Sequence, residues 1–197
     1  MSNRQSLSWD PANLHFQFPI PNQRQRLKDL MIYVSNSCLD DSRFSNVKLL
    51  KILFFSDFEA YGRYGTPITG MPYRRLPFGP APAEYDTIQK EMVRDHLIRI
   101  VDTKVYDLSR QRVLPLTEPK LELFSGNEIA IVANWIRTFW GMSAGKVSEY
   151  SHKKAPWRLA RKSELIPYEA VFISDEPVTY EDADRVKELA ARYGWKL

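Results

Sequence analysis

The sequence is poor in the residues that build cross-links and metal cages. Its 197 residues include one cysteine, Cys38, and three histidines. One cysteine excludes a disulfide within the chain and a cysteine-based metal site, and it is typical of a reducing compartment. Cys38 falls on the apolar face of an expected helix, so we predict a buried thiol. Because His15, His96 and His152 are far apart, we expect structural roles for them and neither metal nor cofactor.

Long apolar runs are also missing. The most apolar stretches, 49–58 and 129–140, are interrupted by polar residues and are too short to cross a bilayer. The first residues carry no hydrophobic signal region. We therefore predict a cytoplasmic protein with no membrane partner.

Catalytic signatures are missing as well. The sequence contains no Gly-x-Gly-x-x-Gly, Walker or Gly-x-Ser-x-Gly element. Asp57 is a candidate general base, but a single carboxylate is more typical of a buried hydrogen-bond acceptor. Glu149 and His152 are three residues apart and can share a helical face. An enzyme would need a cleft that holds such groups together, so we expect a protein that binds rather than catalyses.

What the chain does contain is globular in character, with 44% hydrophobic and 13% aromatic residues and a net charge of +4. The charge is uneven. Segment 137–164 has seven Lys or Arg against two Glu, whereas 175–188 has six Asp or Glu against two Lys or Arg. Such runs are usually solvated helix faces. The functional alternative is a partner-facing basic face beside an acidic tail, and a nucleic-acid-binding autoregulator is a weaker alternative because no helix-turn-helix pattern occurs.

Hydrophobic spacing predicts a mainly α (α+β) protein, a compact helical domain with a small two- or three-stranded antiparallel β element. Apolar residues three and four apart mark helical faces, and the nearly all-round apolar segment 47–61 should be central. Two β-rich runs with a polar linker predict a hairpin. The expected helices are 22–37, 47–61, 82–94, 126–140, 144–152 and 183–193, and the expected strands are 97–106 and 112–116.

Polar residues and prolines predict how these helices begin. Asn22 and Ser143 are candidate N-caps, and Ser125 with Glu128 fits a capping box. Pro82 suits the first turn of the third helix. Ahead of the first helix, residues 1–21 are an irregular, proline-containing arm whose aromatic side chains we expect to dock on the domain.

Three motifs occur in a fixed order. The first is K-L-L-K-I-L-F-F-S-D-F at 48–58. The second is Y-G-T-P-I-T-G at 64–70, which leads to Y-R-R-L-P-F-G-P-A-P at 73–82. The third is V-S-E-Y-S-H at 147–152, followed by A-P-W at 155–157. In this order and spacing the chain resembles the Panacea antitoxin domain (SocA-like) over about 45–160.

The resemblance implies an antitoxin that neutralises a cognate protein toxin by direct contact, or, as an alternative, an adaptor that presents the toxin to a protease complex. It divides the chain into 1–44 (arm and first helix), 45–162 (antitoxin domain) and 163–197 (an extension whose terminal helix packs on the domain). The candidate partner contacts are polar or aromatic: Tyr73, Arg74, Arg75, His152, Trp157 and Arg158. The residues expected to form a rigid scaffold, including a Gly-Pro turn with positive φ at Gly79, are Gly70, Phe78, Gly79, Pro80, Pro82 and Pro156.

Overall fold

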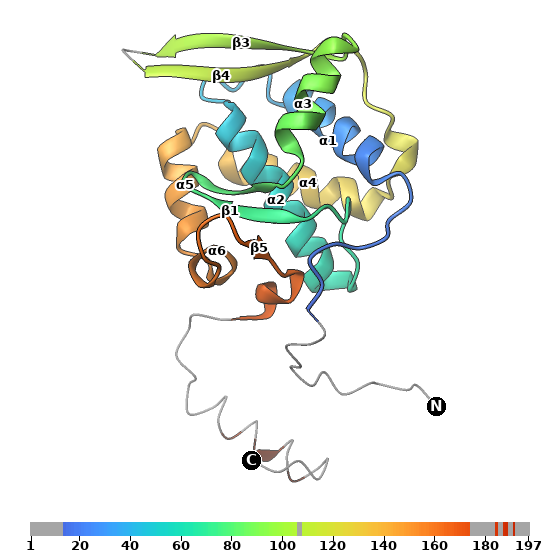
Figure 1. The fold of residues 1–197 in the computed structure, drawn as a ribbon, viewed down its shortest axis with the longest axis vertical. Helices are drawn as coiled ribbons and strands as arrows, with labels where there is room; N and C mark the ends of the chain where they lie inside the picture. Colours follow the sequence, from blue (N-terminus) through green and yellow to red (C-terminus); the bar gives the residue numbers. More distant parts are fainter. Residues whose placement is uncertain (1–13, 106–107, 174–183, 185–186, 189–190, 192–197) are drawn as a thin grey trace.

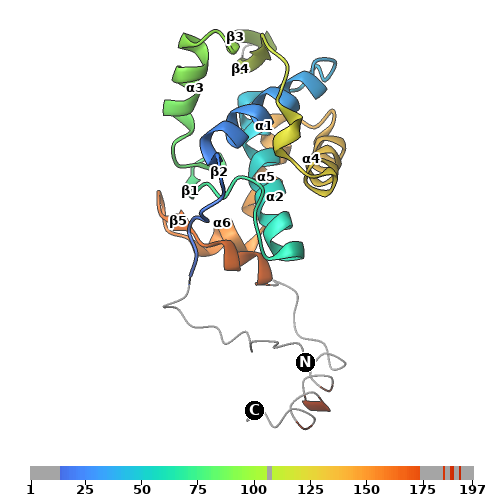
Figure 2. The same cartoon turned by 90° about the vertical axis from the view of Figure 1, so that its right-hand side faces the viewer.

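The structure is a computed structural model that describes residues 14–105, 108–173, 184, 187–188 and 191. It confirms a mainly helical protein with small antiparallel sheets (Figures 1 and 2). The helices are α1 (Gln23–Ser37), α2 (Asn46–Tyr64), α3 (Tyr85–Arg94), α4 (Gly126–Phe139), α5 (Ala144–His152) and α6 (Ala155–Leu159). The strands are β1 (Tyr73–Leu76), β2 (Gly79–Pro82), β3 (Ile98–Val105), β4 (Leu108–Pro115) and β5 (Leu165–Ile166), and two 3₁₀ helices are η2 (Leu121–Leu123) and η3 (Tyr168–Phe172).

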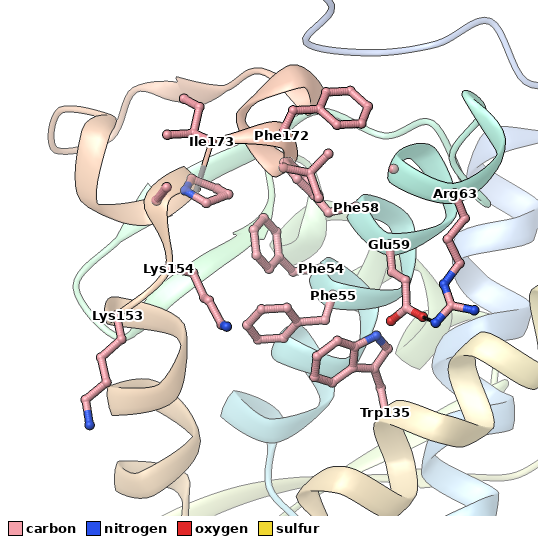
Figure 3. A pocket seen from close by; sticks show the side chains of 14 residues that line it. Phe54, Phe55, Phe58, Glu59, Arg63, Trp135, Lys153, Lys154, Phe172 and Ile173 are labelled. Atoms are coloured by element: carbon pink, nitrogen blue, oxygen red, sulfur yellow. Dashed lines mark ion pairs between the residues drawn. The ribbon is translucent and has the colours of Figure 1, made fainter. Parts of the chain in front are cut away.

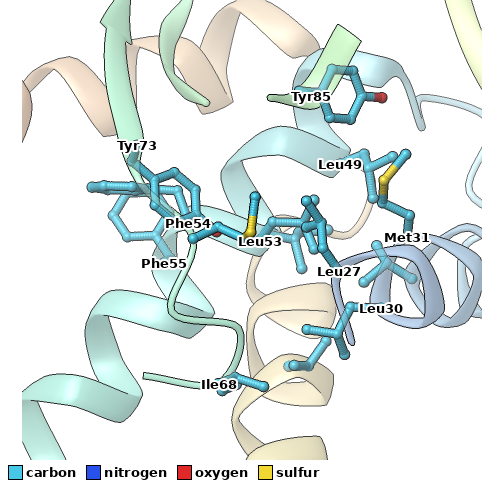
Figure 4. Packing of buried hydrophobic residues seen from close by; sticks show 14 of the residues in the cluster. Leu27, Leu30, Met31, Leu49, Leu53, Phe54, Phe55, Ile68, Tyr73 and Tyr85 are labelled. Atoms are coloured by element: carbon cyan, nitrogen blue, oxygen red, sulfur yellow. The ribbon is translucent and has the colours of Figure 1, made fainter. Parts of the chain in front are cut away.

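Helix α2 is the centre of the molecule, as its apolar sequence predicts. Its buried residues occur on every side of the helix axis, because α1, α4, α5, β2 and η3 all pack around it. The Ser45 side chain accepts a hydrogen bond from the Lys48 amide at the start, and Gly65 ends the helix with φ +72°. Figure 4 shows side chains of α2 meeting those of α1 and the aromatic ring of Tyr73 in one core.

The predicted helix starts are right in three cases and wrong in one. The capping box of Ser125 and Glu128 is present at α4, and the Ser143 side chain caps α5. Asn22 precedes α1 as expected, but it lies in the left-handed region (φ 59°) and its side chain makes no capping bond. Pro82 does not begin the third helix, because it belongs to strand β2 and α3 starts only at Tyr85.

Because Pro82 was expected to begin a helix, the hairpin of β1 and β2 was not predicted. Strand β1 pairs antiparallel with β2, with Tyr73 opposite Pro82 and Leu76 opposite Gly79, and on its other side it pairs with β5. A proline has no N–H to offer a neighbouring strand, so it argues against a central strand. Strand β2 is at the edge of the β2-β1-β5 sheet, where Pro80 and Pro82 are tolerated.

Strands β3 and β4 form the hairpin expected from their β-rich sequence, although β4 begins four residues earlier than predicted. This ribbon lies at the opposite end of the molecule from α6 and β5 (Figures 1 and 2). Arg112 of β4 holds it against the end of α1 by donating to the carbonyl oxygens of Cys38 and Leu39 at 2.8 and 2.5 Å. Cys38 is buried there, as expected, and burial raises the pKa of its thiol to about 12.

The described part of the N-terminal arm docks on the domain. Phe18 packs against the rings of Tyr61 and Tyr168, and its amide donates to the carbonyl of Gly70 at 3.0 Å. Residues 1–13 lie outside the described residues. Most of the predicted helix 183–193 does too, although residues 184, 187–188 and 191 are described, and all four are helical and exposed.

Candidate partner-binding site

Three of the predicted contact residues come together from three different elements. The Trp157 indole of α6 stacks on the ring of His152, at the end of α5, with ring centroids 3.8 Å apart and planes 18° apart. The guanidinium carbon of Arg75, on β1, lies 4.0 Å from the centroid of the Trp157 ring. We call this the Arg75–Trp157–His152 stack. A guanidinium at this distance from an indole gains cation–π attraction.

Hydrogen bonds fix the geometry of the stack. The indole N–H of Trp157 donates to the carbonyl of Leu76 at 3.1 Å, and the guanidinium of Arg75 donates to the carbonyl of Ala160 at 2.8 Å. Each bond joins the β1–β2 hairpin to α6 or the residue that follows it. Pro156 lies in the first turn of α6 and is buried. The hairpin and α6 therefore form one rigid corner.

The tip of the hairpin needs glycine at position 79. Gly79 has φ +101°, as predicted, and a Cβ there would lie 2.2 Å from Lys51 Cε and 2.4 Å from Ser151 Oγ. On the same side, the Ser148 hydroxyl of α5 donates to the carbonyl of Phe78 at 3.0 Å. The hairpin tip is thus clamped between α2 and α5. Gly70 also has a positive φ, of +68°.

A buried lysine lies beneath this corner. Lys51 of α2 is 1% exposed, and its ammonium donates to the carbonyl of Pro80 at 3.0 Å. Burial lowers its pKa to about 7. Burial also lowers the pKa of His152, and the nearby cations Lys51 and Arg75 add to that shift. His152 is therefore largely neutral at pH 7, which allows it to stack on Trp157 without adding a charge beside Lys51.

Sequence reasoning missed Lys51, although a signal was present. Lys48 and Lys51 are one turn apart in a helix that is otherwise apolar nearly all round, so both must be buried. A buried ammonium requires a partner. Lys48 finds one in Asp41, with Nζ and Oδ2 2.6 Å apart, and Lys51 finds one in the Pro80 carbonyl. The Gly79-Pro80 turn thus supplies the acceptor that Lys51 requires.

The other predicted contacts are divided between core and surface. Tyr73 is fully buried, and its hydroxyl donates to Asp57 at 2.8 Å, so it presents no surface to a partner. Arg74 is exposed and donates to the carbonyl of Ser163 at 3.0 Å. Arg158 is exposed on α6. Tyr73 therefore belongs to the core, and the arginines and the stack stay candidate contacts.

Large apolar side chains are exposed at the same corner. Phe78, at the hairpin tip, is 70% exposed, and Leu159, at the end of α6, is 61% exposed. Leu76, whose carbonyl accepts the Trp157 indole, is 38% exposed. With Arg74 and Arg158 these three residues form what we call the corner face. Sequence reasoning treated Phe78 as scaffold, yet an aromatic residue at a hairpin turn, where polar residues are usual, signals an exposed anchor.

The carboxylates that were candidates for catalysis have other partners. Asp57 accepts hydrogen bonds from the Thr69 amide at 2.6 Å, the Thr69 hydroxyl and the Tyr73 hydroxyl. Burial raises its pKa to about 6. It is the buried acceptor that the sequence favours, and it holds the loop before β1. Glu149 pairs with Lys153 at 2.8 Å rather than with His152. Among the described residues, no three His, Cys, Asp or Glu side chains are grouped to hold a metal.

A pocket of about 610 Å³ lies between α2, α4, the α5–α6 junction and η3 (Figure 3). Phe54, Phe55 and Trp135 form its floor, and Phe172 and Ile173 form one edge. It lies beside the α5–α6 junction that leads into the stack, and its lining was not singled out from the sequence. The aromatic residues of α2 were expected to be core, and only the packing of η3 shows which of them border a cavity.

The fold and its corner define a mainly α-helical domain with an exposed surface that is both apolar and basic. A family model described as "Antitoxin SocA-like, Panacea domain" matches residues 49–158, more than half of the chain, and the chain belongs to this family. The matched segment runs from α2 to α6 and so contains the corner face except Leu159, together with all members of the stack. No curated protein and no solved structure matches the chain. Within the described residues, no helix combines the length and the apolar character that a membrane crossing requires.

Proposed function

We propose that this protein is the antitoxin of a toxin–antitoxin pair and neutralises its toxin by direct binding through the corner face. Membership of the antitoxin family supports the antitoxin role. The observation that carries the choice of surface is the exposure of Phe78 at the tip of a clamped hairpin. A few residues carry most of the binding energy in protein interfaces, and aromatic and arginine side chains are enriched among them.

The rigidity of the corner supports the same surface. Binding loses free energy when side chains and loops have to be ordered. The stack and the bonds to Leu76 and Ala160 already hold Arg75 and Trp157 in place. A specific interface buries roughly 1,200–2,000 Å² in total, so the corner face would be the centre of a contact that extends onto neighbouring elements.

The charge of the corner indicates the kind of toxin surface it fits. Arg74 on β1, Arg158 on α6 and Arg161 just after α6 are exposed on or next to the elements that carry the apolar side chains. An apolar patch with a basic rim is complementary to an apolar pocket with an acidic rim, and such complementarity speeds association and fixes the register. We expect the toxin to present such a pocket, and we expect binding to weaken as salt concentration rises.

The test uses the product of the neighbouring gene as the toxin. Phe78→Ser should weaken binding to the purified toxin by about tenfold or more, equivalent to about 1.4 kcal/mol, and should abolish rescue of growth on co-expression. Leu116→Ser is the matched control, because Leu116 is 51% exposed at the opposite, β3–β4 end. If both variants bind as tightly as the original chain, the corner face is the wrong surface.

A second measurement separates direct neutralisation from presentation to a protease and from catalysis. Titration of the purified toxin should reach full inhibition at a fixed molar ratio, with no protease present. Inhibition only after addition of a protease would support the adaptor. Inhibition at a small fraction of the toxin concentration would indicate catalytic inactivation. Either result would overturn our proposal that binding alone neutralises the toxin.

A further inference from the structure

The pocket of Figure 3 has the size and the lining of a small-molecule site. Its volume of about 610 Å³ lies within the range of roughly 300–1,000 Å³ that is usual for ligand pockets. Aromatic rings are paired along its apolar side. The ring centroids of Phe54 and Phe58 are 4.2 Å apart, and those of Phe55 and Trp135 are 4.5 Å apart. Because aromatic rings pack well against one another in offset and edge-to-face contacts, this side suits a ligand that contains a ring.

The charged side chains that line the pocket are unevenly balanced. Arg63, Lys153 and Lys154 are cationic, and Glu59 is anionic. The Glu59 carboxylate pairs with the Arg63 guanidinium at 2.6 Å, and the Lys153 ammonium pairs with Glu149 at 2.8 Å. Within the described chain no carboxylate pairs with Lys154. The lining therefore offers its free positive charge to a ligand at Lys154.

Backbone hydrogen bonds hold Lys154 at the edge of the pocket. It directly precedes α6, its amide donates to the carbonyl of Ser151 at 3.3 Å, and its carbonyl accepts from the amide of Trp157 at 3.1 Å. Figure 3 shows its ammonium directed towards the ring of Phe55, whereas Lys153 points away. A cation whose backbone is already fixed loses less freedom when it binds an anion.

We propose that this pocket binds a small aromatic carboxylate. The ring of the ligand packs against Phe55 and against Phe172, which is 53% exposed at the pocket edge. Its carboxylate accepts a hydrogen bond from the Lys154 ammonium, and such charge-assisted bonds are stronger than neutral ones. None of the residues of the corner face lines the pocket. The inference therefore does not depend on the corner face or on a toxin.

The test titrates the isotope-labelled, full-length protein with 2-naphthoate and follows the amide signals by NMR. We expect saturable shifts for Gly62 and Val171, which line the pocket, and no shifts for Ile100 and Val113 of the β3–β4 ribbon. 2-Naphthamide has the same rings without the charge. It should bind about fivefold more weakly, which is the upper end for an ion pair that is open to solvent.

Two matched pairs of variants locate the carboxylate and the rings of the probe. Lys154→Gln should weaken the binding of 2-naphthoate by about fivefold, whereas Lys153→Gln, at the adjacent exposed position, should leave it unchanged. Phe172→Ser should also weaken binding. Phe78→Ser, which removes an exposed aromatic ring from the corner face, should not.

Three outcomes would overturn the proposal. Shifts at Gly62 and Val171 that are absent or do not saturate would mean that the pocket is not a binding site. Equal affinities for 2-naphthoate and 2-naphthamide, or equal effects of the two lysine variants, would remove Lys154 from the site. Loss of binding in Phe78→Ser but not in Phe172→Ser would place the probe on the corner face.

Discussion

Three glycines differ in whether a side chain is disfavoured by the backbone angle φ, by lack of space, or by neither. Gly79 combines a positive φ with close contacts to Lys51 and Ser151. Gly141 has φ +68° but nothing within 4 Å of its missing Cβ, and Gly145, inside α5, has neither restriction. Of these three, only Gly79 is a position where a methyl group has to displace neighbouring side chains, those of Lys51 on α2 and Ser151 on α5. The three positions therefore separate the cost of strain from the cost of overlap.

We expect Gly79→Ala to lower the free energy of unfolding by about 2–4 kcal/mol, because strain and overlap act together. Gly141→Ala should cost about 1–2 kcal/mol from strain alone, and Gly145→Ala should cost nothing or stabilise slightly. Urea unfolding of the three variants measures each value. Equal costs at positions 79 and 141 would mean that α2 and α5 yield easily around the hairpin tip.

Lys51 gives the stability of the protein a specific pH dependence. Its pKa is about 7 in the folded chain and near its ordinary value of 10.5 in the unfolded chain. Between these values the unfolded chain holds a proton that the folded chain has released, so the free energy of unfolding rises with pH. The slope approaches about 1.4 kcal/mol per pH unit. Above pH 9 Cys38 and the buried tyrosines act in the opposite direction.

Replacement of Lys51 by methionine tests this origin. In urea unfolding between about pH 7 and 8.5, Lys51→Met should flatten the rise in stability, because the group that titrates is gone. Lys90→Met, an exposed lysine of α3, should keep the rise. A Lys51→Met variant with the original slope would assign the pH dependence to another group.

At the scale of elements, α4 shows the clearest local signal. The Ser125 hydroxyl accepts from the Glu128 amide at 3.3 Å, and the Glu128 carboxylate accepts from the Ser125 amide at 2.7 Å. We expect Ser125→Ala to lower the free energy of unfolding by about 1 kcal/mol. Asn134→Ala, at an exposed position of the same helix, should be neutral or slightly stabilising. Thermal unfolding compares the two, and equal values would leave the capping box without a measurable role.

The helices were predictable because their signals are local, and the β1–β2 hairpin was not. Spacing and caps located α1, α2, α4 and α5 from the sequence alone. Two prolines in four residues predicted a turn and a helix start at the position of β2. The sequence near β2 does not show that β1 pairs with it on one side. The pairing of β1 with β5 joins segments some ninety residues apart in sequence, which no local pattern can predict.

The candidate site was predictable in its residues rather than in its arrangement. The motifs pointed to Arg75, His152 and Trp157, and these three do meet. Nothing in the sequence gave the order of the stack or the burial of Tyr73. Both follow from how α6 returns to the hairpin, which is a property of the tertiary packing.

At the scale of the whole molecule, the packed unit is larger than the segment the family model matches. Tyr168, ten residues beyond the match, is fully buried, and its hydroxyl donates to the carbonyl of Met71 at 2.7 Å. Its amide donates to the carbonyl of His15 in the N-terminal arm at 2.9 Å. The segments that precede and follow the matched residues thus pack around one core.

We expect Tyr168→Ala to remove about 3–5 kcal/mol of stability, a large share of the total for a domain of this size. Phe172→Ala, in the same 3₁₀ helix but 53% exposed, should cost less than about 1 kcal/mol. Circular dichroism during denaturant unfolding reports both. If Tyr168→Ala is as mild as Phe172→Ala, the segment after the match is an appendage and not part of the core.

The prolines of β2 have a consequence for the behaviour of the protein in concentrated solution. The amides of Ala81 and Ala83 are on the side of β2 that faces β1, as the bond from Ala83 to the Pro72 carbonyl shows. The alternate positions 80 and 82 lack an N–H, so the outer border of this sheet has no donors there. A row without donors cannot serve as a template for strand-by-strand growth. This border, which packs against α2 and α5, therefore offers no main-chain template for amyloid-like stacking, and another chain must recognise this corner through side chains.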